Sequence, residues 1–195
     1  MAGATLDTLE KTLSREHYLD SGPYHREFAA IFSCGWVCVG RAEALSAPGD
    51  YQAQRFGDQS IVVIRGEDLE LQAFYNVCQH RGVRLVDDHA GNTEHFRCPY
   101  HSWRYGTDGD LIYAPHQEGF QEGLPIGSIC LPKVRCEEAL GFYWINLDHE
   151  AEPLDDFLKD SPLNCTVLRG FGASPYSGME PSSRISPSRL HFLNS

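Results

Sequence analysis

The chain has 195 residues, 42% of them hydrophobic and 22% charged, which is enough for one globular domain with a core of ordinary size. No apolar run is long enough to cross a membrane and the start lacks the features of a signal peptide, so we expect a cytoplasmic protein with no membrane partner. The formal net charge of −11, without a basic stripe, opposes binding to phosphate backbones and excludes nucleic acid as an expected partner.

Residues 1–35 are predicted to form a helical lead-in. Ser21-Gly22-Pro23 is typical of a helix start, because proline is tolerated in the first turn. Phe28, Ile31 and Phe32 then follow the i, i+3, i+4 spacing of one apolar helix face.

From residue 36 to residue 150 the pattern changes to short strands separated by turn residues, which predicts a mainly β domain. The β-branched run from Ser60 to Arg65 is the richest in strand-forming residues. A further strand from Leu71 to Val77 ends directly before Cys78, so the strands deliver a metal-binding loop. The predicted strands are 36–39, 51–56, 60–65, 71–77, 93–97, 111–113 and 141–147.

The last part of the chain, residues 151–195, is predicted as a short helix and an irregular tail. The helix starts at Pro153, with Asp155 and Asp156 in its first turn, where the helix dipole favours negative charge. The last 35 residues contain eight Ser and four Pro and follow neither helix nor strand periodicity. We therefore expect the tail from 161 to 195 to be poorly ordered.

Two short motifs combine cysteine with histidine. Cys78-Gln79-His80 and Cys98-Pro99-Tyr100-His101 are separated by the seventeen residues 81–97. A zinc ion accepts two Cys and two His, but zinc sites usually place like ligands next to each other in sequence. Here each motif contributes one thiolate and one imidazole, which suits two irons, one held by both cysteines and one by both histidines. The five other cysteines are expected to be small buried side chains: Cys34, Cys38, Cys130, Cys136 and Cys165.

These motifs and their flanks, Asn76 to Gly82 and Cys98 to Trp103, resemble the Rieske iron–sulfur family. The resemblance implies an antiparallel β-sandwich in which two loops hold a [2Fe–2S] cluster. It also implies that Cys78 and Cys98 bind the inner iron and that His80 and His101 bind the outer, more exposed iron.

Three residues beside the ligands are predicted to contact the cluster. Arg81 offsets the charge of the cluster or hydrogen-bonds nearby carbonyls, with a surface salt bridge as the alternative. Trp103 resembles the aromatic residue that packs over the cluster and excludes water. Tyr100 lies between the two ligands of the second loop.

The flanks resemble in particular the α subunit of Rieske non-haem iron oxygenases, which include ring-hydroxylating dioxygenases and monooxygenases. Rieske proteins of respiratory complexes carry an extra cysteine in each ligand loop and a serine where this chain has Trp103. Fewer hydrogen bonds to the cluster sulfurs imply a lower reduction potential here. A freestanding Rieske-type ferredoxin and a structural zinc module are the alternatives.

The resemblance implies an electron donor, which is a reductase or a ferredoxin, and an electron acceptor. The acceptor is a mononuclear iron held by two His and a carboxylate in a catalytic domain, commonly of a neighbouring α subunit. That motif does not appear in this sequence, so we expect no catalytic residue here, whether the chain is a truncated product or a genuine short protein. The only other group that could supply two His and a carboxylate consists of Asp87, Asp88, His89 and His95. We expect these residues to form a solvated loop with a turn at Gly91-Asn92 instead.

Overall fold

The computed structural model describes residues 12–87, 89–119 and 126–159. The predicted tail from 161 to 195, Cys165 and Asp88 lie outside the described residues. Within the described part, no helix combines the length and the apolar character that a membrane-spanning segment requires.

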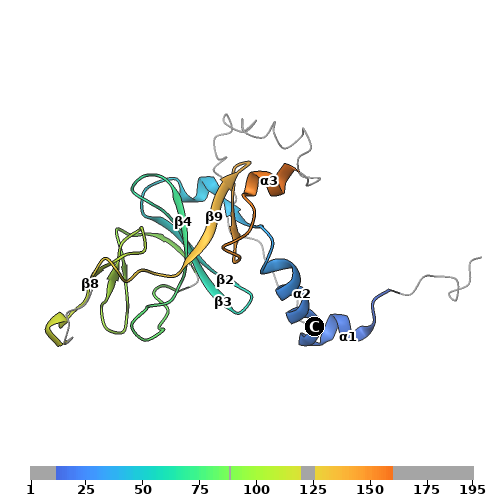
Figure 1. Cartoon of the computed structure of the whole chain (residues 1–195), viewed down its shortest axis with the longest axis horizontal. Helices are drawn as coiled ribbons and strands as arrows, with labels where there is room; N and C mark the ends of the chain where they lie inside the picture. Colours follow the sequence, from blue (N-terminus) through green and yellow to red (C-terminus); the bar gives the residue numbers. More distant parts are fainter. Residues whose placement is uncertain (1–11, 88, 120–125, 160–195) are drawn as a thin grey trace, which may run out of the picture.

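Two antiparallel sheets make up the molecule (Figure 1). The larger sheet has seven strands in the order β1-β10-β9-β4-β3-β2-β5 and the smaller has three in the order β6-β7-β8. The larger sheet consists of β1 (Val37–Arg41), β2 (Asp50–Phe56), β3 (Gln59–Arg65), β4 (Leu71–Tyr75), β5 (Ala90–Asn92), β9 (Lys133–Ala139) and β10 (Phe142–Asn146). The smaller sheet consists of β6 (Phe96–Arg97), β7 (Arg104–Tyr105) and β8 (Leu111–Tyr113). This architecture confirms the mainly β, antiparallel class predicted from the sequence.

The position of strand β3 between two cores explains why the run from Ser60 to Arg65 is so rich in β-branched residues. Val62 and Ile64 point into a first core, while Ile61 and Val63 point into a second core, and all four are fully buried. Burial on both faces removes the polar positions that a one-sided strand would alternate with. The first core joins the two sheets and includes Phe74, Phe96, Tyr105, Leu111 and both motif cysteines.

The α-helices lie on the side of the molecule away from strand β8 (Figure 1). The lead-in contains α1 (Arg15–Leu19), α2 (Ser21–Glu27) and a π-helix (Phe28–Phe32), and α3 spans Leu154–Lys159. The prediction of helix is therefore confirmed, but most of the predicted apolar face stays exposed. Phe28 packs on the ring of Phe56, whereas Ile31 is 58% and Phe32 41% exposed. Phe32 nevertheless stacks on Phe28, with ring centroids 6.0 Å apart, so these two rings share one face of the π-helix.

Three further expectations need correction. Strands β5, β7 and β9 were not predicted, and the predicted turn at Gly91-Asn92 is part of β5, which pairs with β2. Cys34, Cys38 and Cys130 are exposed rather than buried. Cys38 is exposed because β1 is an edge strand of the larger sheet, and sequence alone does not reveal the order of the strands.

Candidate metal centre

The two ligand loops share one backbone geometry. In the first loop, Gly82 N–H donates to the carbonyl of Cys78 at 2.9 Å, and in the second Ser102 N–H donates to the carbonyl of Cys98 at 3.0 Å. The residue four positions after each cysteine has a left-handed backbone conformation, with φ of 70° at Gly82 and 59° at Ser102. The amide of each cysteine in turn donates to the carbonyl of the residue five positions on, at 2.8 Å in both loops. Two matching turns therefore each carry one Cys/His pair, with the histidine two positions after Cys78 and three positions after Cys98.

The two cysteines form the inner end of the site. Cys78 and Cys98 are each only 2% exposed and belong to the first core. Burial raises the pKa of the Cys78 thiol, and the neighbouring Cys98 thiol adds to the increase. A pair of buried cysteines side by side is a site where a bound cation stabilises the thiolates.

The two histidines form the outer end. The rings of His80 and His101 lie 4.7 Å apart, at an interplanar angle of 68°, and both side chains are partly exposed. In the part of the chain that the structure describes, the buried Nδ1 atoms of both rings have no hydrogen-bond partner. A buried ring nitrogen without a partner is costly unless a ligand satisfies it, so both Nδ1 atoms fit metal coordination.

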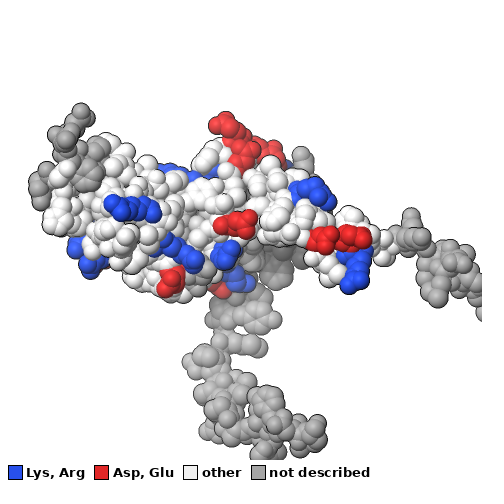
Figure 2. Space-filling model, turned by 90° about the horizontal axis from the view of Figure 1, so that it is seen from below, with Lys and Arg blue, Asp and Glu red and all other residues white. Residues whose placement is uncertain are grey.

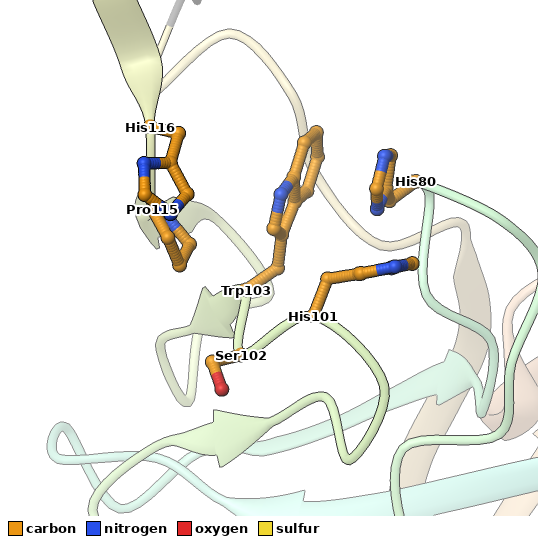
Figure 3. A pocket seen from close by; sticks show the side chains of 6 residues that line it. All are labelled: His80, His101, Ser102, Trp103, Pro115 and His116. Carbon is orange, nitrogen blue, oxygen red and sulfur yellow. The ribbon is translucent and has the colours of Figure 1, made fainter.

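Trp103 closes one side of the histidine pair. Its indole ring stacks on the His80 imidazole, with ring centroids 4.7 Å apart and planes only 7° apart. Figure 3 shows Trp103 standing between His80 and the pair Pro115 and His116. These residues, with His101 and Ser102, line a hollow of about 440 Å³ on the surface. The histidine end of the site is therefore accessible from outside, while its cysteine end is not.

Asn76 fixes the first loop in place from inside. The side chain is 2% exposed, and its Nδ2 group donates to Ser60 Oγ at 3.1 Å and to the Val86 carbonyl at 2.7 Å. Its Oδ1 atom accepts from the amides of Leu85 and Val86 at 3.1 and 3.2 Å. One amide side chain thus joins the strand before the loop to the end of the loop, which holds Cys78 and His80 on a closed backbone.

Tyr105 is a site residue that the sequence did not identify. Its hydroxyl lies 3.4 Å from Cys78 Sγ and accepts a hydrogen bond from Gln79 N–H at 3.0 Å. Burial, then the nearby Cys78 thiol, raises the pKa of the Tyr105 hydroxyl, so it stays protonated and able to donate. The only available signal was its position four residues after His101, and its reach to the other loop appears only in the fold.

The remaining predicted site residues lie on the outer surface. Arg81 is exposed and follows His80 directly, and Tyr100 is 58% exposed with its ring centroid 3.7 Å from that of His101. His89 of the predicted solvated loop contacts Tyr51, whose hydroxyl lies 3.2 Å from its Nε2 atom. Among the described residues, no three His, Cys, Asp or Glu side chains come together around a point where one metal ion could bind.

Comparison with known proteins agrees with the fold and with the paired loops, which together define an iron–sulfur domain. The Rieske [2Fe–2S] domain profile matches residues 35–133. The carnitine monooxygenase oxygenase subunit of Acinetobacter pittii is 36% identical over 81% of this chain and 43% of its own length. The large oxygenase component of the naphthalene 1,2-dioxygenase system of Pseudomonas putida is 36% identical over 78% of this chain and 35% of its own length.

Solved structures of Rieske oxygenases are similar to this chain in fold as well as in sequence. The apo form of the quaternary ammonium Rieske monooxygenase CntA superposes with a TM-score of 0.69 at 34% identity, covering 75% of this chain and 43% of the other. Naphthalene 1,2-dioxygenase with bound indole gives a TM-score of 0.64 at 36% identity, covering 69% and 31%. The chain belongs to the Rieske [2Fe–2S] domain family, whose cofactor is a [2Fe–2S] cluster, and it spans less than half the length of the oxygenase subunits it matches.

Proposed function

We propose that Cys78 and Cys98 bind the inner iron of the [2Fe–2S] cluster and that His80 and His101 bind the outer iron through Nδ1. The observation that carries this assignment is the pair of buried Nδ1 atoms without partners, facing the same site as two buried thiols. Two thiolates balance part of the charge of the irons, while two neutral imidazoles leave the outer end less negative.

When bound, such a cluster accepts and releases one electron at a time. The residues of this chain set the conditions for that exchange. The cysteine end lies inside the first core, where water does not reach it, and the Tyr105 hydroxyl donates to the Cys78 sulfur. The histidines need their protons on Nε2 so that Nδ1 is free to bind, and the Trp103 stack fixes the ring of His80 in that orientation.

We further propose that the domain relays electrons as the Rieske part of an oxygenase α subunit. The supporting observation is that similarity to oxygenase subunits extends over 165 residues, well beyond the Rieske match itself. In this role the histidine end receives an electron from a reductase or ferredoxin and delivers it to a mononuclear iron held outside the described residues. The substrate of that second iron is set by residues that lie elsewhere.

The ligand assignment is tested by metal analysis of the purified chain together with a ligand exchange. Two irons and two acid-labile sulfides per chain, without zinc, are expected. The His101→Cys variant should keep a cluster with a lower midpoint potential, because a thiolate donates more electron density to iron than an imidazole. His116 lines the same hollow but is not a proposed ligand. His116→Asn, which tolerates the left-handed φ of 58° at this position, should leave the potential unchanged. Zinc in place of iron, or an unchanged potential in His101→Cys, would overturn the assignment.

A further inference from the structure

The exposed apolar side chains of the molecule are concentrated in the helical lead-in. Of the eleven large hydrophobic side chains that are exposed in the described part of the chain, six lie between positions 13 and 32. Single exposed hydrophobic residues are ordinary on a protein surface, but a concentration of this kind marks an interaction surface. The six residues are Leu13, Tyr18, Leu19, Tyr24, Ile31 and Phe32.

The lead-in packs on the larger sheet through Phe28. Its ring lies 5.3 Å from the ring of Phe56 and covers Gly57, where a Cβ atom would overlap it. Tyr24 and Phe32 extend from Phe28 in both directions, with ring centroids 6.1 and 6.0 Å away. Figure 1 shows α1 and α2 projecting from the sheets. This row of aromatic rings is therefore anchored at its centre, while its two outer members stay exposed.

The apolar area of the lead-in is large enough for a stable dimer. A large side chain covers about 150–250 Å², so six side chains that are about half exposed present roughly 450–750 Å² per copy. The largest apolar patch of a typical monomer is about 300–600 Å². Two copies that cover this surface against each other would bury roughly 900–1,500 Å², and specific protein interfaces bury about 1,200–2,000 Å².

The lead-in carries little of the negative charge of the chain. Residues 12–36 contain two arginines and three carboxylates, whereas the formal net charge of the whole chain is −11. Figure 2 shows charged side chains of both signs at the right-hand end of the described surface, where α1 and α2 lie in Figure 1. Two copies of this chain therefore repel each other least when they meet through the lead-in.

The order of the residues in the lead-in is self-complementary. In a two-fold symmetric dimer, residue i of one copy meets residue j of the other, and j meets i. Ser21 begins α2 directly after the break between the two helices, so an antiparallel alignment about Ser21 joins residues at equal distances on either side of it. All residues joined in this way that carry a charge or an aromatic ring at six, five and three positions from Ser21 are exposed. The joined pairs are Arg15 with Glu27, Glu16 with Arg26, and Tyr18 with Tyr24.

We infer that two copies of this chain pair through their lead-ins in antiparallel orientation, with α1 of one copy against α2 of the other. A second copy fits better than a different protein, because the carboxylates that would face Arg15 and Arg26 are present in the lead-in itself at matching distances. The hollow beside the histidines includes Pro115 and His116, directly after β8, and the lead-in lies on the side away from β8 (Figure 1). Pairing therefore leaves the histidine ends of both copies open, and the inference is independent of the proposed electron relay.

Association is measured by analytical ultracentrifugation of the cluster-loaded 195-residue chain at low ionic strength, where charges are least screened. The mass should rise from 21.9 kDa towards twice that value as the concentration increases from about 1 to about 100 μM. Tyr18→Gln removes the ring that meets Tyr24 and should weaken association at least about tenfold, without loss of a core contact. Ile112→Gln is the matched control, because Ile112 is similarly exposed on β8, and should leave association unchanged.

A charge exchange distinguishes this dimer from any other. Arg15→Glu and Glu27→Arg each place like charges opposite one another in both halves of the dimer, and each should weaken association about tenfold. The double variant Arg15→Glu/Glu27→Arg restores opposite charges and should associate as the unchanged chain does. Both changes suit their helix ends, since Arg15 lies in the first turn of α1 and Glu27 in the last turn of α2. Glu67→Arg, at an exposed position between β3 and β4, controls for the change in net charge.

Every outcome supports or overturns the pairing. A chain that stays at 21.9 kDa at all concentrations overturns it, and so does a dimer held by a disulfide, which non-reducing electrophoresis reveals. A dimer that the changes in the lead-in leave intact also overturns it, because such a dimer uses another surface. Weaker association in both single charge variants, with recovery in the double variant, is the result that the inference requires.

Discussion

The indole ring of Trp103 lies parallel to the imidazole ring of His80, with 4.7 Å between their centroids and 7° between their planes. Trp103 comes from the second ligand loop and His80 from the first, so the stack connects the two loops across the site. Trp103 is also 5% exposed and part of the first core, which fixes the indole itself. The ring of His80 therefore takes its orientation from the core through one aromatic contact.

Replacing Trp103 tests this connection. Trp103→Leu should release the cluster severalfold faster in air, because His80 loses the surface that orients its ring and excludes water, whereas Trp103→Phe keeps an aromatic ring and most of the protection. The rate is followed as loss of visible absorbance. Trp144→Leu, a change in a different core cluster, controls for general destabilisation. Equal rates in Trp103→Leu and Trp144→Leu would contradict a specific role of the stack.

The Tyr105 hydroxyl is expected to raise the midpoint potential of the cluster. Tyr105→Phe removes the hydrogen bond to the Cys78 sulfur. This hydrogen bond stabilises the reduced cluster more than the oxidised cluster, because the sulfur is more negative after reduction. A loss of about 1 kcal/mol corresponds to a decrease of about 40 mV for one electron, measurable by redox titration. Tyr143 belongs to the second core, and its hydroxyl donates to Gln52. As a control, Tyr143→Phe should therefore leave the midpoint potential unchanged. An equal shift in both variants would exclude a direct effect on the sulfur.

Gly82 should resist substitution for a reason of backbone conformation alone. Its φ of 70° is left-handed, yet a Cβ atom there would meet no heavy atom within 4 Å. Gly82→Ala is therefore expected to lower the free energy of unfolding by about 1–2 kcal/mol in urea denaturation. At Gly119 the same space is free but φ is outside the left-handed region, so Gly119→Ala should cost nothing measurable or stabilise slightly. A neutral Gly82→Ala would show that the turn tolerates another conformation.

The buried hydroxyl of Tyr143 makes the stability of the fold sensitive to alkali. Burial raises its pKa from 10.0 to about 12, so the unfolded chain ionises first as pH rises. Below pH 10 both states keep the proton and the group has no effect on pH dependence. Between pH 10 and about 12 the unfolded state binds fewer protons than the folded state, and the free energy of unfolding falls. Tyr143→Phe should show a shallower decline over this window; an identical slope would contradict the burial effect.

The sequence predicted those features that depend on local pattern. The run from Ser60 to Arg65 identified β3 because burial on both faces selects β-branched residues throughout. The strand β9 was missed because four residues of Lys133–Ala139 are charged and most are partly exposed, so the short alternation of Val134 and Cys136 with charged residues is a weak strand signal. The exposure of Cys38 was equally hidden, since it depends on β1 being an edge strand.

At the site, the motif spacing predicted the two Cys/His pairs, but not the residues that hold the two loops in place. Tyr105 reaches Cys78 across 27 positions in the sequence, and this contact exists only once β7 of the smaller sheet packs against the larger sheet. The sequence placed Asn76 in the motif, yet its four hydrogen bonds to Ser60, Leu85 and Val86 follow from the closed loop. Long-range polar contacts of this kind have no sequence period by which to find them.

The most direct test of the account is electron–nuclear double resonance on the reduced chain labelled with ¹⁵N-histidine. Ligation by His80 and His101 through Nδ1 predicts strong couplings from two histidine nitrogens, and one of them should disappear in His80→Cys. A spectrum without strong nitrogen coupling would mean that the reduced cluster is held by thiolates alone, and would contradict the assignment of the two histidines as ligands.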